Sequence, residues 1–451
     1  MRRSGILLHP GVLFTLLWTA VLGAWLLTPE STFLRYTSSE KYVSASAIAF
    51  FLIALGAFAV GTLVGPAMFR SDRPARLTLP DVTDAGLKVL VRGTGWIFAL
   101  GAVASLYLIV AGAERAGGFS ALLNAIVNGE TWSRLAENYF KPAKIALVTV
   151  WLHLIVAAAP LSAMGAAAAQ DRATKRRQLW ILAGGFVIAL LISFVFAERL
   201  IAFGYVVSAA VAWGAARRAL NKGGLQGLRG RSLLRFVLVG LIIVGFWLSS
   251  EISRTYLATR KSTAPVGVGD VGAGTPLAAE RFLAYVITSA NNGMYAIDHF
   301  RERSYVASSL SVVFTSLGWD GENAPIVGPG SRETDRMLNE LYPHNNPLTS
   351  FSLPGYAFMD LVGPGAILLF WFGAAIGAVY ARFRHGELWA LLVYPLCVVG
   401  ILDSYRVMYW SRTQMVVPVL AIGLLMASVY RATAESRRTE VPVRQMKPTV
   451  S

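Results

Sequence analysis

The chain has 451 residues, of which 55% are hydrophobic and 15% are charged, and its formal net charge is +16. Soluble domains carry about 25% charged residues, so the composition excludes an ordinary soluble protein and favours a polytopic membrane protein. Lysine and arginine collect in a few short intervals between apolar blocks, as in the cytoplasmic loops of membrane proteins, and we expect no nucleic-acid partner.

Ten apolar blocks are long enough for a transmembrane helix, which needs roughly 17–25 residues. Seven of them precede a long polar interval, and three follow it. We therefore expect an all-α polytopic membrane protein of about ten transmembrane helices with one large extracytoplasmic loop. The predicted spans are 6–27, 43–69, 88–112, 144–169, 179–197, 200–216, 233–250, 356–381, 387–403 and 413–430.

The distribution of basic residues orients these spans. Arginine and lysine are frequent in every second connection and in the tail, and they are sparse in the short connections between. Under the positive-inside rule, both termini are then cytoplasmic and the long polar interval is extracytoplasmic. The predicted organisation is a seven-span bundle (1–250), an extracytoplasmic loop domain (251–355), a three-span bundle (356–432) and a disordered cytoplasmic tail (433–451).

Two outer intervals carry predicted structure of their own. Residues 113–142 contain an amphipathic stretch that we interpret as a helix lying in the membrane interface, or as a lid over a lipid substrate. In the long loop, 263–276 is rich in glycine and proline and is expected to be flexible. Residues 277–300 have helical spacing of apolar residues, interrupted at Asn291-Asn292-Gly293. A loop this long is expected to carry function.

Several motifs are absent from the sequence. It has no phosphate-binding Gly-x-x-x-x-Gly-Lys-Ser/Thr loop, no His-Glu-x-x-His and no Asp-x-Asp, and Cys397 is its single cysteine. These absences argue against an ATP-driven pump and a zinc hydrolase. We expect chemistry without a metal and without a cofactor.

Charged residues near the outer ends of the spans need an explanation, because an ionisable group at membrane depth is a candidate for function. Glu198-Arg199 lies between two short spans, where it forms either a salt-bridged turn or part of a site. Arg406 and Arg412 lie between the last two spans, as part of either an interfacial aromatic belt or a site. Arg254 follows the seventh span and is either a partner of Glu251 or a substrate ligand.

Arginine binds phosphate through two parallel hydrogen bonds and stays charged, so a group of arginines on the outer rim suits a lipid-linked diphosphate. His344 lies in the long loop beside Asn345, between Pro343 and Pro347. A neutral imidazole accepts a proton near pH 7, although a loop histidine can also bond only to backbone.

The loop ends in His344-Asn-Asn-Pro-Leu-Thr-Ser-Phe, and Tyr356-Ala-Phe-Met-Asp360-Leu-Val-Gly363-Pro-Gly365 then enters a span. This segment and the arrangement of spans resemble the oligosaccharide repeat-unit polymerases, the Wzy-type polymerases of O-antigen and exopolysaccharide. The Glu198-Arg199 hairpin is similar to an arginine-bearing hairpin of that family. The resemblance implies a fold of the GT-C class in the plasma membrane.

The resemblance also implies the substrate and partners. These polymerases join undecaprenyl-diphosphate-linked oligosaccharides at the outer face of the membrane, alongside a chain-length regulator and a flippase. Arginines can stabilise the departing diphosphate without a metal. We assign substrate binding to Arg199, Arg254, Arg406, Arg412 and Asn345, the role of base to His344 or Glu198, and the orientation of that base to Asp360.

Two other classes are considered. A ligase-type transferase of the O-antigen-ligase kind would pass the glycan to a different acceptor. A polysaccharide or lipid transporter usually has inverted repeats and broken helices at the midplane, and no internal repeat is visible in this sequence.

Overall fold

The computed structural model describes residues 8–37, 40–69, 77–115, 117–127, 146–195, 199–220, 271–300, 332–341 and 350–444. In these residues the structure is built from helices and contains no β-strand, which confirms the predicted all-α class. Seven helices in the described part of the chain are long and apolar enough to cross a membrane, so this is a multi-pass membrane protein. They are α1 (Pro10–Leu27), α3 (Ala45–Met68), α4 (Asp84–Arg115), α7 with α8 (Ala146–Leu152, Leu154–Ala168), α9 (Arg172–Val195), α16 (Gly365–Arg384) and α18 (Thr413–Arg444).

Two further helices coincide with predicted spans. The hairpin partner of α9 is α10 (Arg199–Ala219), and α17 (Leu388–Asp403) is a shorter apolar helix. The hairpin is closed by the backbone N–H of Ala202, which donates to the Ser193 hydroxyl at 3.3 Å. The predicted span 233–250 lies outside the described residues.

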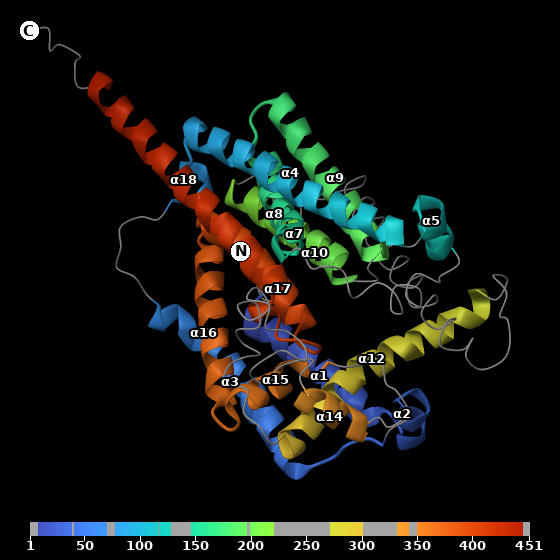
Figure 1. The fold of residues 1–451 in the computed structure, drawn as a ribbon. Coiled ribbons are helices and arrows are strands. Elements are labelled where there is room, and N and C mark those ends of the chain that lie inside the picture. Colours follow the sequence, from blue (N-terminus) through green and yellow to red (C-terminus); the bar gives the residue numbers. More distant parts are fainter. Residues whose placement is uncertain are drawn as a thin grey trace, which may run out of the picture.

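The helices form two groups joined by α17 (Figure 1). One group contains α1, α3 and α16, and the other contains α4, α8, α9, α10 and α18. Helix α8 is the centre of the second group, because almost every residue in it is buried. Its many alanines allow neighbouring helices to approach closely, as small residues do in membrane proteins. The last three spans therefore pack among the earlier ones rather than apart from them.

Helices α3 and α16 are packed backbone to backbone. Each carries two glycines four residues apart, Gly61 and Gly65 in α3 and Gly373 and Gly377 in α16. A Cβ atom on any of the four would overlap backbone of the other helix. Paired Gly-x-x-x-Gly motifs are typical of such contacts. Because the hydrophobic effect does not drive helices together within lipid, close van der Waals packing is a main source of their association.

Contacts between helices define two ends of the bundle. The Tyr394 hydroxyl of α17 donates to the Leu8 carbonyl, and Trp18 Nε1 of α1 donates to Ser404 Oγ at 3.0 Å. Helices α1 and α17 are therefore parallel. We call the end that contains Leu8 the base, and the opposite end, which contains Trp25, the crown.

Several segments that connect helices are hydrogen-bonded to one another at the base. The backbone N–H of Leu79 donates to the Gly386 carbonyl at 3.2 Å, and the backbone N–H of Leu388 donates to the Leu77 carbonyl at 3.1 Å. The Arg437 side chain of α18 donates to the Asp81 carbonyl at 2.7 Å. Both described ends of the chain thus lie at the base, as expected if the two termini share one side of the membrane.

The interval between α10 and α12 (Val271–His299) joins opposite ends of the bundle. Ala219, the last residue of α10, lies beside Gly386 at the base. Asn291 of α12 accepts a hydrogen bond from Trp25 Nε1 at 3.4 Å, at the crown. Ala219 and Asn291 thus lie at opposite ends of the bundle, as expected if a seventh span lies between them.

Among the described residues, the crown holds α2 (Glu30–Thr37), α12, α14 (Arg332–Leu341) and α15 (Ser352–Leu361) (Figure 1). Helix α12 begins within the interval expected to be flexible, and Asn291 to Gly293 do not interrupt it. These residues are buried. A Cβ atom at Gly355 of α15 would overlap Gly293 Cα, and one at Gly293 would overlap Phe351 and Ser352, so the two glycines let α15 pack directly against α12.

The eighth predicted span, 356–381, is corrected by the structure. A break separates α15 from α16, so the spanning helix begins at Gly365 rather than at residue 356. Val362 has φ 57° and ψ −129°, which ends α15, and Pro364 follows. Proline disfavours helical geometry at the residue before it, which explains why the apolar run does not form one helix.

The tail is also corrected. Residues 433–444 were expected to be disordered, but α18 continues to Arg444. Arg431 and Glu435 form an ion pair at 3.0 Å one helical turn apart, and such pairs favour a helix. In the interval expected to hold an interfacial helix, a short helix α5 (Phe119–Val127) is present, with Phe119 and Leu123 exposed.

Reporter fusions test the topology. A fusion after residue 225 and one after residue 270 should give opposite signals, because they flank the predicted seventh span. A fusion after residue 80, in the base connection, should match residue 225. The measurement is the activity of reporters that work on only one side of the membrane, and equal signals at 225 and 270 would contradict this topology.

Candidate functional site

The connection between α17 and α18 lies deep in the bundle. Ser404 bonds to Trp18, which is in the middle of α1, about 12 Å along the axis from either end of that helix. Trp410 stacks on Phe58 and Phe372, with ring centroids 5.4 and 5.7 Å away, and Phe58 is in the middle of α3. Because α17 has only 16 residues, its end stops well short of the crown. This connection is therefore recessed and is not a belt at the rim.

Asp403 and Arg406 form a forked ion pair in this connection. Arg406 Nε lies 3.1 Å from Asp403 Oδ1, and Nη2 donates to Oδ2 at 3.2 Å. The Asp403 side chain is 6% exposed and that of Arg406 is 26% exposed. A buried carboxylate needs such a partner, so the Asp403 carboxylate already neutralises much of the charge of Arg406. The accessible part of its guanidinium can still meet a ligand.

Arg412 is held differently. Its guanidinium carbon lies 5.9 Å from the ring centroid of Tyr356, on α15. The side chain is partly buried, and no carboxylate in the described part of the chain forms an ion pair with it. The charge of Arg412 acts on the nearby Asp403 carboxylate without a direct ion pair. A recessed arginine with no directly paired carboxylate among the described residues is a natural place for an anionic ligand.

Helix α15 is fastened to this connection through backbone. The N–H of Ser352 donates to the Arg406 carbonyl at 3.2 Å, and the N–H of Leu353 donates to the Ser404 carbonyl at 2.9 Å. On the other side, Asn292 Nδ2 of α12 donates to the Ser350 carbonyl at 3.1 Å. The segment that carries the end of the predicted motif is thus held between α12 and the recessed connection.

One face of α15 carries buried polar residues. Ser352, Tyr356 and Asp360 are four residues apart, and all three are almost fully buried. Residues at this spacing lie above one another on a helix, so Asp360 is on the same face as the ring that Arg412 approaches. Ser352 Oγ has no hydrogen-bond partner among the described residues. The predicted residues Asp360, Arg406 and Arg412 are therefore gathered around α15.

Arg199 begins α10, and the structure does not describe its side chain. Gly204, five residues later, lies against α17 and its following connection. A Cβ there would be 3.3 Å from Val399 Cγ1 and 3.9 Å from the Tyr409 hydroxyl. The first turn of α10 therefore lies on the crown side of the recessed connection.

Four predicted site residues lie outside the described residues, so their assignments stay predictions. They are Glu198, Arg254, His344 and Asn345.

Two contacts of the site were not predicted from the sequence: Tyr356 is the neighbour of Arg412, and Asp403 is the partner of Arg406. The spacing of Asp403 and Arg406, three residues apart, was a visible signal for the second pair. No comparable signal links Tyr356 to Arg412, because those residues are distant in the chain. A scan against protein-family models and searches of curated proteins and of solved structures found no match to this chain.

Proposed function

We propose that the protein polymerises undecaprenyl-diphosphate-linked oligosaccharide repeat units, with its crown at the outer face of the plasma membrane. The observation that supports this most is the recessed Arg412, a guanidinium without a carboxylate partner in the described residues, beside the helix that ends the Wzy-like motif. A cation in that position calls for an anion that enters from the membrane.

A lipid diphosphate has the right chemistry for this place. Its charge pairs with guanidinium through forked hydrogen bonds, and its polyprenyl chain stays in the bilayer. In this proposal Arg412 binds the diphosphate, Arg406 contributes the accessible part of its guanidinium, and Arg199 adds a contact from α10. Arg254 and Asn345 bind the remaining polar groups of the substrate.

The reaction is a glycosyl transfer. The bond between the anomeric carbon and the diphosphate oxygen breaks, and a hydroxyl oxygen of the acceptor glycan bonds to that carbon. The hydroxyl proton passes to a base, for which His344 and Glu198 are the candidates and Asp360 the orienting group. The bonding electrons leave with undecaprenyl diphosphate, and arginines that stabilise its developing charge lower the barrier.

The fold and partners belong to the same proposal. A GT-C-like membrane frame would hold the crown helices over the recessed connection. A flippase would supply substrate at the crown, and a chain-length regulator would limit the product.

Deletion of the gene tests the function. A strain without it should accumulate a single repeat unit on its lipid carrier and lose the polymer, and the wild-type gene should restore both. The measurement is electrophoresis of surface polysaccharide together with mass spectrometry of lipid-linked intermediates. Polymer on the lipid carrier that never reaches its final acceptor would favour a ligase. Repeat units trapped on the cytoplasmic side would favour a transporter.

A further inference from the structure

A second polar cluster lies at the crown, outside the recessed arginine site. The rings of Tyr295 and His299 stack with centroids 3.9 Å apart and an interplanar angle of 5°. Tyr42 meets both rings edge-on, at 5.1 and 5.2 Å. All three side chains are partly exposed. We call Tyr42, Tyr295 and His299 the crown aromatic cluster.

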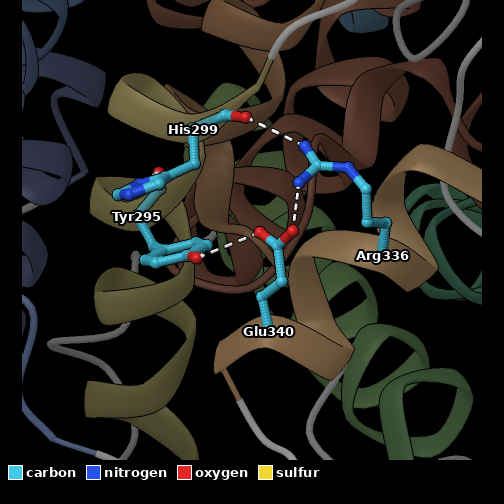
Figure 2. A network of polar contacts seen from close by, with 4 residues as sticks. All are labelled: Tyr295, His299, Arg336 and Glu340. Carbon is cyan, nitrogen blue, oxygen red and sulfur yellow. Dashed lines mark hydrogen bonds and ion pairs between the residues drawn. The ribbon is translucent and has the colours of Figure 1, made fainter.

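Two exposed carboxylates border this cluster. Asp298 accepts hydrogen bonds from the hydroxyls of Tyr42 and Ser46, each at 2.7 Å. Glu340 of α14 accepts from the Tyr295 hydroxyl at 3.3 Å (Figure 2). A carboxylate has about four acceptor positions, so both groups keep capacity for hydroxyl donors from a ligand.

Figure 2 shows how α14 is fixed to α12 at this point. Arg336 forms an ion pair with Glu340 and donates through Nη2 to the His299 carbonyl at 3.2 Å. His299 Nδ1 lies 3.1 Å from the Tyr295 carbonyl. When Nδ1 donates there, Nε2 is the acceptor nitrogen of the neutral ring. The cluster thus brings partly exposed aromatic rings, a nitrogen acceptor and carboxylate oxygens together in one place.

The Tyr42 segment is held in place before any ligand arrives. Its backbone N–H donates to Asn291 Oδ1 at 2.7 Å. The preceding Lys41 donates to the Leu26 carbonyl at 3.0 Å, and its ammonium lies 4.8 Å from the Trp25 ring centroid. A surface fixed in this way loses little conformational entropy when it binds a ligand.

The charge of the cluster narrows the ligand class. Burial alone would raise the pKa of Asp298, but hydrogen bonds from Ser44, Ser46 and Tyr42, together with His299, hold that pKa below its ordinary value. Asp298 is therefore a charged acceptor at neutral pH and repels anions. Glu340 is already paired with Arg336. Aromatic rings beside charged acceptors suit a ligand with apolar C–H faces and many hydroxyl donors.

We propose that the crown aromatic cluster, with Asp298 and Glu340, binds a neutral, hydroxyl-rich segment of an oligosaccharide. The assignment of its natural ligand rests on the proposed function: it would hold the glycan of a lipid-linked substrate while the diphosphate occupies the recessed arginines. The binding surface itself needs no diphosphate and no turnover.

Binding of free glycans tests this directly. The full-length protein, purified in detergent and fluorescently labelled, is applied to an array of immobilised bacterial oligosaccharides that includes maltoheptaose. The wild type should bind at least one neutral oligosaccharide on the array. Asp298→Asn keeps the volume and removes a charged acceptor, so binding should weaken about tenfold or more. His299→Gln should weaken it as well.

Asp171→Asn is the matched control. Asp171 is an exposed carboxylate before α9, it accepts from the Thr174 N–H at 2.7 Å, and it lies far from the crown. Its loss should leave glycan binding unchanged. Thermal unfolding identifies folded variants, and either crown variant is sufficient if the other fails to fold.

The outcomes separate the two proposals. No binding by the wild type, or wild-type binding by both crown variants, would overturn the glycan surface. Glycan binding that depends on Asp298 in a protein that makes no polymer would keep the surface and reject the polymerase. If the protein makes polymer and Asp298→Asn does not weaken glycan binding, the polymerase proposal would stand and the glycan surface would be rejected.

Discussion

Replacing Arg412 by alanine should reduce the rate of polymer formation about a hundredfold or more. Loss of one preorganised donor to a developing negative charge typically costs about 2.7–4 kcal/mol. Arg412 is the strongest candidate for that donor, because its guanidinium faces the Tyr356 ring and forms no direct ion pair with a carboxylate of the described residues. The measurement is polymer length and amount in a strain that lacks the native gene.

Lysine substitutions distinguish an arginine that binds the substrate diphosphate from one whose guanidinium is only solvated. Lysine keeps the charge but cannot form the forked pair with a phosphate, so Arg412→Lys and Arg199→Lys should also be damaging. A guanidinium that only reaches toward headgroups would tolerate lysine. Arg431→Lys is the control, because Arg431 is exposed and already paired with Glu435. Normal polymer from Arg412→Ala at equal protein level would remove Arg412 from the site.

A second large effect is expected where α3 and α16 touch. Gly65→Ala places a methyl group against the Ala374 carbonyl and leaves the two backbones no room to stay in contact. Overpacking of this kind costs about 1–3 kcal/mol, and here the obstacle is backbone, which cannot rotate away. We expect a clear fall in the thermal unfolding temperature of the purified protein and less folded protein in the membrane.

The same helix provides its own control. Gly56 is exposed in α3, and a Cβ there meets nothing within 4 Å. Gly56→Ala should leave stability unchanged or raise it slightly, because alanine is the better helix former. Equal unfolding temperatures for the Gly65 and Gly56 variants would show that α3 and α16 are not in backbone contact.

The existence of most helices could be predicted from the sequence, because apolar length alone identifies a span. How these helices pack against one another was harder to predict from the sequence. Gly61-Thr-Leu-Val-Gly65 and Gly373-Ala-Ala-Ile-Gly377 were visible motifs, but nothing local says that they face each other. The break at Val362 had a signal in Pro364, which the strong hydropathy of the surrounding run outweighed.

The candidate site was predictable only in part. The sequence supplied Arg406 and Arg412 as unusual charges between two spans, and placed them at the rim. Their depth follows from the short α17 and from the bond between Trp18 and Ser404, whose partners are far apart in the chain. The crown aromatic cluster joins Tyr42 to Tyr295 in the same long-range way, so no local pattern could reveal it.

Reconstitution of the purified protein tests the polymerase proposal most directly. The protein is placed in liposomes with a single lipid-linked repeat unit as the only substrate, and the products are separated by size. The proposal predicts a ladder of lipid-linked oligomers, with one undecaprenyl diphosphate released for each new linkage and no ladder from Arg412→Ala. Repeat units that cross the bilayer without becoming longer would contradict it.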